Sequence, residues 1–282
     1  MKRRAWRAAL LVAMTALAAC ESVSEKEDPL GQNAIDDAGL NDLLLTAGDP
    51  ESSVNYFQQA LATEPERADL RRGLAISLNR AKRYPEAARI YQEMIALGQA
   101  QPADRLAYGF VAIRLGQWED AKVVDAQIPP GLNSARRHLF SAMLADNDEN
   151  WGAADQAYAR AETLATNPAD ILNNWGVSQM SRGDLPQAEV AFQRALSFDS
   201  KLFSAKNNLA ISRGLQGDYN LPLVPMTERE KAIILNNLGL IATRKGELRQ
   251  ARGLFAAAVD THPQHYAAAA DRLAALDGKV EN

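Results

Sequence analysis

The sequence predicts an all-α fold, an α-solenoid of about seven helical hairpins closed by a C-terminal capping helix. The stretch from Ile171 to Leu196 is repeated, landmark by landmark, from Ile234 to Val259, sixty-three residues later. A small residue also recurs along the chain every 33 or 34 residues, and a fixed period of this length indicates stacked helical repeats. The composition agrees, because aromatic residues make up only 6%, alanine is abundant and no long alternating strand pattern occurs. One hairpin cannot bury its own apolar face, so successive hairpins must pack on one another.

The amino end has the three parts of a secretory signal peptide. Residues 1–19 begin with basic side chains, continue as an apolar stretch too short to span a bilayer, and end in small residues. The sequence at their close, Leu17-Ala18-Ala19-Cys20, resembles a bacterial lipobox, whose cysteine becomes the lipidated first residue after cleavage. An ordinary cleaved signal with an incidental cysteine is the alternative. Cys20 is the only cysteine in the chain, and its position at the end of the signal favours lipidation.

The resemblance to lipoproteins implies an anchor and a location. The cysteine of such proteins carries a diacylglyceryl thioether and usually an amide-linked acyl chain, and several chains hold a protein firmly on a bilayer. Glu21, rather than Asp, follows the cysteine, which favours the periplasmic face of the outer membrane of a Gram-negative bacterium. Residues 20–36 are polar and acidic, and we expect a flexible tether that reaches at most about 50 Å.

The repeat units share a small residue that opens each second helix and, in most units, an aromatic residue one turn later. The small residues are Ser53, Ala87, Ala121, Ala154, Ala188 and Ala251, and the aromatic residues are Phe57, Tyr91, Tyr158, Phe192 and Phe255. Glycines fall where first helices should end, at Gly48, Gly116, Gly183, Gly217 and Gly246. Together with Leu-Gly-type pairs and a closing proline, these landmarks resemble the tetratricopeptide repeat.

Three departures from the period predict local changes. Asp125 replaces the aromatic residue of the third unit and Pro129-Pro130-Gly131 follows, so this second helix should be short. Pro222 and Pro225 interrupt the sixth unit, which predicts an extended segment at residues 218–226 in place of a second helix. Thr227 to Glu230 reads as a capping box that restarts the helical pattern. We therefore expect a single superhelix over residues 37–282, with its first helices lining a concave surface and an Ala-rich cap from His265 to Asp277.

No catalytic constellation is present in the sequence. It has no glycine-rich phosphate loop, no paired-histidine zinc motif and no cysteine nucleophile within the repeats. The nearest candidate is His262-Pro263-Gln264-His265, but its proline lies at a repeat boundary, so a surface loop is favoured over a metal site. We expect no enzyme activity, no cofactor and no bound metal. The net charge of −4 also argues against nucleic acid as the main partner.

An asparagine doublet recurs three times, just before the Leu-Gly-type pair. Its members are Asn173, Asn174, Asn207, Asn208, Asn236 and Asn237. A side-chain amide both donates and accepts, so these residues could bind the backbone of an extended peptide in a groove. The resemblance to peptide-binding tetratricopeptide proteins points to Asn174, Asn208 and Asn237 in that role. Alternatively, one Asn of each pair could bond only to a neighbouring helix.

The combination of lipid anchor, tether and repeats resembles the lipoproteins of the tight-adherence (Flp) pilus assembly system. The resemblance is clearest from Ile171 to Leu276. In this region the asparagine doublets, the proline-interrupted sixth unit and the ending around His262 are similar to those of the pilus lipoproteins. It implies a periplasmic scaffold that binds proteins and assists assembly of an outer-membrane secretin. A general envelope adaptor, for outer-membrane protein assembly or polysaccharide export, remains the alternative.

Overall fold

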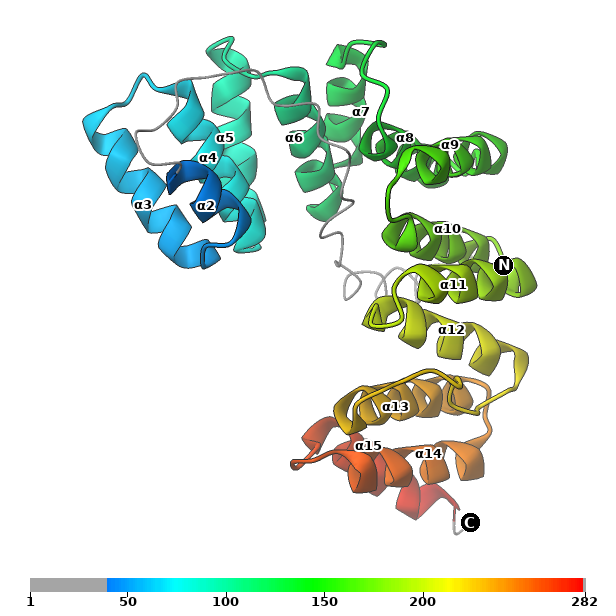
Figure 1. The fold of residues 1–282 in the computed structure, drawn as a ribbon. Coiled ribbons are helices and arrows are strands. Elements are labelled where there is room, and N and C mark those ends of the chain that lie inside the picture. Colours follow the sequence, from blue (N-terminus) through cyan, green and yellow to red (C-terminus); the bar gives the residue numbers. More distant parts are fainter. Residues whose placement is uncertain (1–39, 281–282) are drawn as a thin grey trace. The chain divides into compact units, whose positions relative to one another are not determined.

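The computed structural model describes residues 40–280 of the 282-residue chain. The predicted signal peptide at residues 1–19, Cys20 and the tether at residues 20–36 lie outside the described residues. Within residues 40–280 the chain forms fourteen α-helices and no β-strand (Figure 1). These residues fall into two compact units, 40–166 and 167–280, each of which has its own succession of packed helices.

The unit of residues 40–166 consists of four helical hairpins. Their helices are α2 (Leu40–Thr46), α3 (Pro50–Thr63), α4 (Ala68–Arg80), α5 (Tyr84–Ala96), α6 (Pro102–Arg114), α7 (Trp118–Gln127), α8 (Ala135–Asn147) and α9 (Trp151–Leu164). At 10 residues α7 is shorter than the 13- and 14-residue helices α3 to α6 around it, as its prolines predict. Asp125 stands in α7 where an aromatic residue is missing, and its carboxylate lies 2.7 Å from Arg137 of α8. An ion pair with the next helix therefore occupies the place of a packed ring.

The unit of residues 167–280 contains both copies of the long repeat. Its helices are α10 (Ala169–Ser181), α11 (Leu185–Phe198), α12 (Phe203–Gln216), α13 (Glu228–Arg244), α14 (Leu248–Thr261) and α15 (Ala267–Val280). The two copies form the hairpins α10–α11 and α13–α14. No second helix follows α12; the chain is non-helical from residue 218 to residue 227, where Pro222 and Pro225 lie. The capping box then forms as expected, because Thr227 and Glu230 each bond to the other's backbone N–H.

Close packing of an aromatic ring on a glycine holds each of the long hairpins together. An added Cβ on Gly176 of α10 would lie 2.5 Å from the Phe192 ring of α11, and one on Gly239 would lie 2.6 Å from the Phe255 ring of α14. Phe192 is 0% exposed and Phe255 is 1% exposed. Only glycine permits this approach, so the Leu-Gly-type pair and the aromatic residue of each copy form a single contact.

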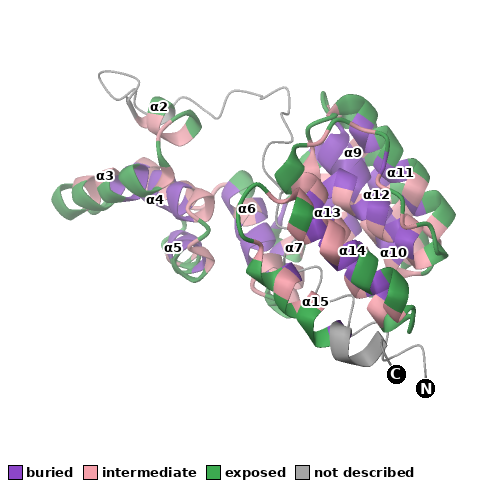
Figure 2. Ribbon diagram, turned by 90° about the horizontal axis from the view of Figure 1, so that it is seen from below, coloured by how far each residue is buried: buried purple, intermediate pink, exposed green. Residues whose placement is uncertain are grey.

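Buried and exposed residues recur along each helix in turn, which Figure 2 shows as purple and green segments of the ribbon. The small residues that open the second helices, Ser53, Ala87, Ala121, Ala154, Ala188 and Ala251, are all 0% exposed. At the carboxyl end, Ala269 and Leu276 of α15 are buried as well, and Leu276 packs in one core cluster with Phe255. The final helix therefore covers the apolar face that the last hairpin would otherwise expose.

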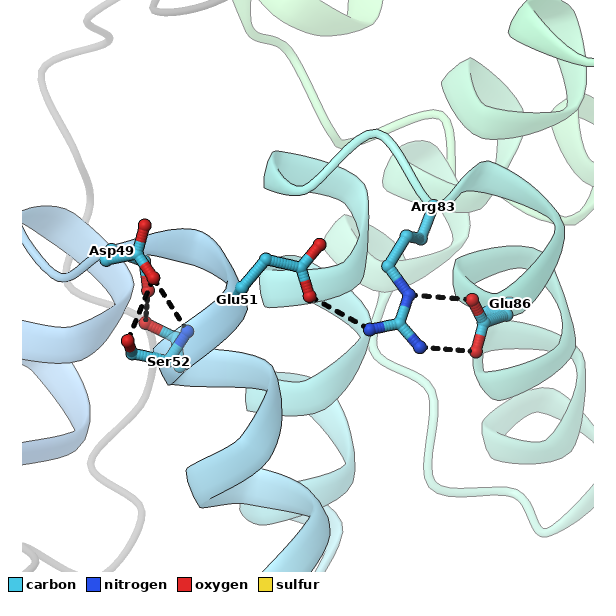
Figure 3. A network of polar contacts seen from close by, with 6 residues as sticks. Asp49, Glu51, Ser52, Arg83 and Glu86 are labelled. Carbon is cyan, nitrogen blue, oxygen red and sulfur yellow. Dashed lines mark hydrogen bonds and ion pairs between the residues drawn. The ribbon is translucent and has the colours of Figure 1, made fainter.

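Polar contacts fasten α3 and α5 at their amino ends (Figure 3). The Asp49 carboxylate caps α3 by accepting from the backbone N–H of Ser52 at 2.8 Å, a bond that lowers the pKa of Asp49. The guanidinium of Arg83, at the start of α5, donates to Glu51 of α3 at 3.0 Å and to both carboxylate oxygens of Glu86 at 2.7 and 2.8 Å. These groups are solvent-exposed, so they orient the two helices more than they stabilise them.

None of the helices between residues 40 and 280 combines the length and the apolar character that a bilayer crossing requires.

Candidate functional site

The three asparagine doublets lie on α10, α12 and α13, all in the unit of residues 167–280. In α10 and α13 each doublet is followed by the glycine on which an aromatic ring packs, and in α12 Ala210 occupies that position. The structure separates the six residues into two groups by burial. One group holds helices together, and the other lies partly in solvent.

The buried group consists of Asn173, Asn208 and Asn236, which are 4%, 0% and 5% exposed. Asn208 Nδ2 donates to Asn173 Oδ1 at 3.0 Å, which joins α12 to α10. Arg272 Nη1 of α15 donates to Asn236 Oδ1 at 2.8 Å, which joins α15 to α13. Buried amides need such partners, because an unpaired polar group costs about 1–3 kcal/mol. These three side chains therefore make contacts between helices.

The half-buried group consists of Asn174, Asn207 and Asn237, which we call the amide row. Asn237 Nδ2 donates to Asn207 Oδ1 at 2.7 Å, and Asn174 Nδ2 donates to the backbone oxygen of Asp170 at 2.9 Å. Asn237 Oδ1 also accepts from Asn236 Nδ2 of the same helix at 3.5 Å. An asparagine side chain has two N–H donors and an oxygen with two lone pairs, so the bonds of Asn207 and Asn237 leave capacity on these two amides for a ligand. In α12 it is Asn207, and not Asn208, that is partly in solvent. The resemblance alone pointed to Asn208, and no feature of the α12 sequence distinguishes the two.

An ion pair between a buried lysine and a half-buried glutamate lies next to the amide row. Lys206 is 4% exposed, and its Nζ lies 3.2 Å from Glu230 Oε1 across the gap between α12 and α13. Burial by itself would raise the pKa of Glu230, but the Thr227 N–H and the Lys206 ammonium outweigh that effect, so the net pKa is lowered. The pair ties α12 to the start of α13 where a second helix is missing. This ion pair was not predicted from the sequence. A signal for it was present, because Lys206 directly precedes the amide and apolar residues Asn207 to Ala210.

One carboxyl group near the row titrates close to neutral pH. Asp170, at the amino end of α10, is 9% exposed, and burial together with the nearby Asp199 raises its pKa to about 6. Its backbone oxygen is the group that accepts from Asn174. The charge beside this end of the amide row therefore changes between pH 5 and pH 7.

The sequence His262-Pro263-Gln264-His265 forms the loop between α14 and α15. His262 Nδ1 lies 2.8 Å from the Gln264 backbone oxygen, and its ring packs on Tyr266 with centroids 4.9 Å apart. Both contacts are internal to the loop. In the part of the chain that the structure describes, no group of three or more His, Cys, Asp or Glu side chains could hold a metal ion.

Comparison with known proteins places the fold. Residues 42–104 match the family described as tetratricopeptide repeat. No curated protein sequence matches the chain. Among solved structures, a chain of the APC/C hetero-tetramer Cut9–Hcn1 is 16% identical with a TM-score of 0.60; the match covers 84% of this chain and 48% of that chain. The chain thus spans about half the length of that protein.

A second solved structure matches over nearly its whole length. The tetratricopeptide repeat protein from Parabacteroides merdae ATCC 43184 is 15% identical with a TM-score of 0.55, and the match covers 84% of this chain and 96% of that protein. At this level of identity the likeness is one of fold. The predicted fold class is thus confirmed: the chain is an α-solenoid of tetratricopeptide-type hairpins, six of them complete within residues 40–280, with α12 as the first helix of a seventh.

Proposed function

We propose that this chain is a lipid-anchored scaffold that binds another protein through the amide row and performs no chemistry itself. The observation that carries the proposal is the partial exposure of Asn174, Asn207 and Asn237 on first helices that are joined by amide contacts. Amides held in place by the fold can bond to a peptide backbone without the entropic cost of ordering them on binding. The APC/C hetero-tetramer Cut9–Hcn1, one chain of which shares the fold, is a precedent for an array of this type within a protein assembly.

Anchoring follows from the amino end of the sequence. Leu17-Ala18-Ala19-Cys20 has the form of a lipobox, and Glu21 in place of Asp favours the outer membrane over the inner one. Acylation of Cys20 would hold the repeats at the periplasmic face, with residues 20–36 as a tether. The resemblance to tight-adherence pilus lipoproteins then points to a subunit of the outer-membrane secretin as the partner, whose assembly or localisation this chain would assist.

Partner capture is tested by converting Asn174, Asn207 and Asn237 together to alanine. We expect the variant to keep its helical circular dichroism and to recover much less secretin in a pull-down from solubilised envelopes. The matched control is Gln193→Ala with Gln250→Ala, which removes exposed amides from the second helices α11 and α14. Undiminished recovery by the triple variant would refute the role of the amide row.

The anchor and the pilus assignment need separate measurements. Cys20→Ala should abolish incorporation of labelled palmitate, whereas Cys20→Ala protein that still incorporates the label would contradict lipidation at this residue. Deleting the gene should lower the amount of secretin in the outer-membrane fraction, and the wild-type gene should restore it. An unchanged secretin level would remove the pilus assignment and leave a scaffold for another envelope protein.

A further inference from the structure

A buried carboxylate lies unpaired at the amino end of α10. Asp170 is 9% exposed, yet within residues 40–280 no hydrogen bond or ion pair holds its side chain. Burial and the neighbouring Asp199 raise its pKa, so the surroundings disfavour the ionised form. Buried carboxylates are normally paired with a cation or with several donors, because an unpaired one is costly. The described part of the chain therefore holds an acidic group for which it supplies no partner.

The amino end of α12 lies against this carboxylate. Asn208, the sixth residue of α12, bonds to Asn173, the fifth residue of α10, at 3.0 Å. Asp170 and Ser204 each lie one helical turn before these asparagines, on the same faces of their helices. Asp199 precedes α12 in the chain and acts electrostatically on Asp170, which places the carboxylate beside the start of α12. Asp170 and Ser204 therefore border the same junction.

Hydrogen-bond acceptors exceed donors at this junction. Among the residues that the structure describes, Ser204 Oγ and Asn208 Oδ1 also have no hydrogen-bond partner, and the two residues are 8% and 0% exposed. A carboxylate and an amide oxygen can only accept, and a hydroxyl oxygen can accept as well. The group that satisfies all three is a donor with a positive charge. An ammonium group has that charge and three N–H donors, one for each of these groups.

The geometry points to a lysine subsite: the segment that the amide row binds places a lysine ammonium on Asp170, with Ser204 and Asn208 as further acceptors. This inference rests on the proposed function, because Asp170 lies one turn before Asn174 of the amide row and on the same face of α10. Lysine fits a recessed carboxylate better than arginine does, since its ammonium is compact and its four-carbon stem is flexible. Packed helices lie about 10 Å apart, a distance that an extended chain covers in about three residues. The lysine therefore lies about three residues from the part of the segment that meets Asn207 on α12.

A photocrosslinking residue at position 207 of the full-length chain, used in living cells, measures capture of the partner. Asp170→Asn should lower the adduct yield by about tenfold or more, because it removes the charge that faces the lysine. The same change relieves the cost of a buried, unpaired carboxylate, so the variant should be at least as stable as the wild type and a lost adduct does not reflect unfolding. The matched control is Asp260→Asn, at an exposed carboxylate on the second helix α14, and it should leave the yield unchanged.

The partner's half of the contact is identified from the same adduct. Mass spectrometry should show a lysine about three residues from the attachment point. Replacing that lysine with methionine should lower the yield as much as Asp170→Asn does, and the two changes together should lower it no further. Wild-type yield from Asp170→Asn, additive losses, or an attachment point without a lysine nearby would overturn the subsite and leave capture by the amide row intact. No adduct from position 207 of the unsubstituted chain would remove the proposed function and the subsite together.

Discussion

Replacing Gly176 with alanine tests the ring-on-glycine contact that closes the hairpin α10–α11. The new Cβ would lie 2.5, 2.8 and 2.9 Å from three carbons of the Phe192 ring, distances at which either the ring or the helix must move. Phe192 is 0% exposed, so its ring is surrounded on all sides. Overpacking of this kind costs about 1–3 kcal/mol, whereas alanine gains about 1 kcal/mol over glycine in a helix. The net change should lie between neutral and a loss of about 2 kcal/mol.

The matched control is Gly253→Ala in α14, where an added Cβ meets no atom within 4 Å. Here only the helix propensity acts, so stability should rise by up to about 1 kcal/mol. Urea denaturation followed by circular dichroism measures both variants, and their difference of about 1–3 kcal/mol is the cost of the contact. Combining Gly176→Ala with Phe192→Leu should recover part of the loss through a favourable coupling energy. If Gly176→Ala stabilises the protein as much as Gly253→Ala does, the contact does not have the proposed geometry.

Three further variants test the polar groups of the same unit. Asp170→Asn should raise the melting temperature at pH 7.5 but not near pH 4. The pKa of Asp170 is about 6 in the folded state and 3.8 in the unfolded state, so the wild type loses stability as the pH rises from about 4 to above 6, while the uncharged asparagine does not. An equal gain at both pH values would contradict this. Lys206→Met should lower the free energy of unfolding, measured by urea denaturation, by about 1–3 kcal/mol, because the half-buried Glu230 carboxylate loses its cation. Adding Glu230→Gln should restore part of the lost stability. A loss that this second change does not affect would refute the pairing. Thr227→Ala should cost about 1 kcal/mol in the same assay by removing the cap of α13, and an unchanged midpoint would show that the cap does not contribute.

Most of the fold follows from local sequence signals. The positions of the helices, the short α7, the extended segment after α12 and the capping box at Thr227 all depend on residues close together in the chain, where backbone chemistry acts directly. The division into two compact units near residue 166 does not show in the period, because the small residue at Ala154 is followed by Ala188 at the usual interval. The repeat period predicts that successive hairpins occur along the chain, but it does not predict where the chain divides into compact units.

The candidate site was only partly predictable, because burial of an asparagine depends on how a helix is rotated against its neighbours. Asn174 and Asn208 are 34 residues apart and occupy equivalent repeat positions, yet Asn174 is half-buried and Asn208 is 0% exposed. Asn174 lies on α10, which is followed by its second helix α11, whereas no second helix follows α12. The surroundings of Asn208 on α12 therefore differ from those of Asn174. The aromatic partners of Gly73 and Gly109 show a similar effect, since their rings come from Phe57 of the preceding hairpin and Phe140 of the following one. The repeat pattern predicts a small residue there but not the ring that fills the space.

The central claim is that the amide row contacts a protein partner, and a photocrosslinking residue at position 207 in living cells tests it most directly. Asn207 is half-buried in the row and bonded to Asn237, so a probe there should form an adduct that mass spectrometry identifies as a secretin subunit. The same probe at Gln193 on the exposed face of α11 provides the background. An adduct specific to position 207 is the predicted result. Equal labelling from both positions, or none from position 207, would contradict the claim.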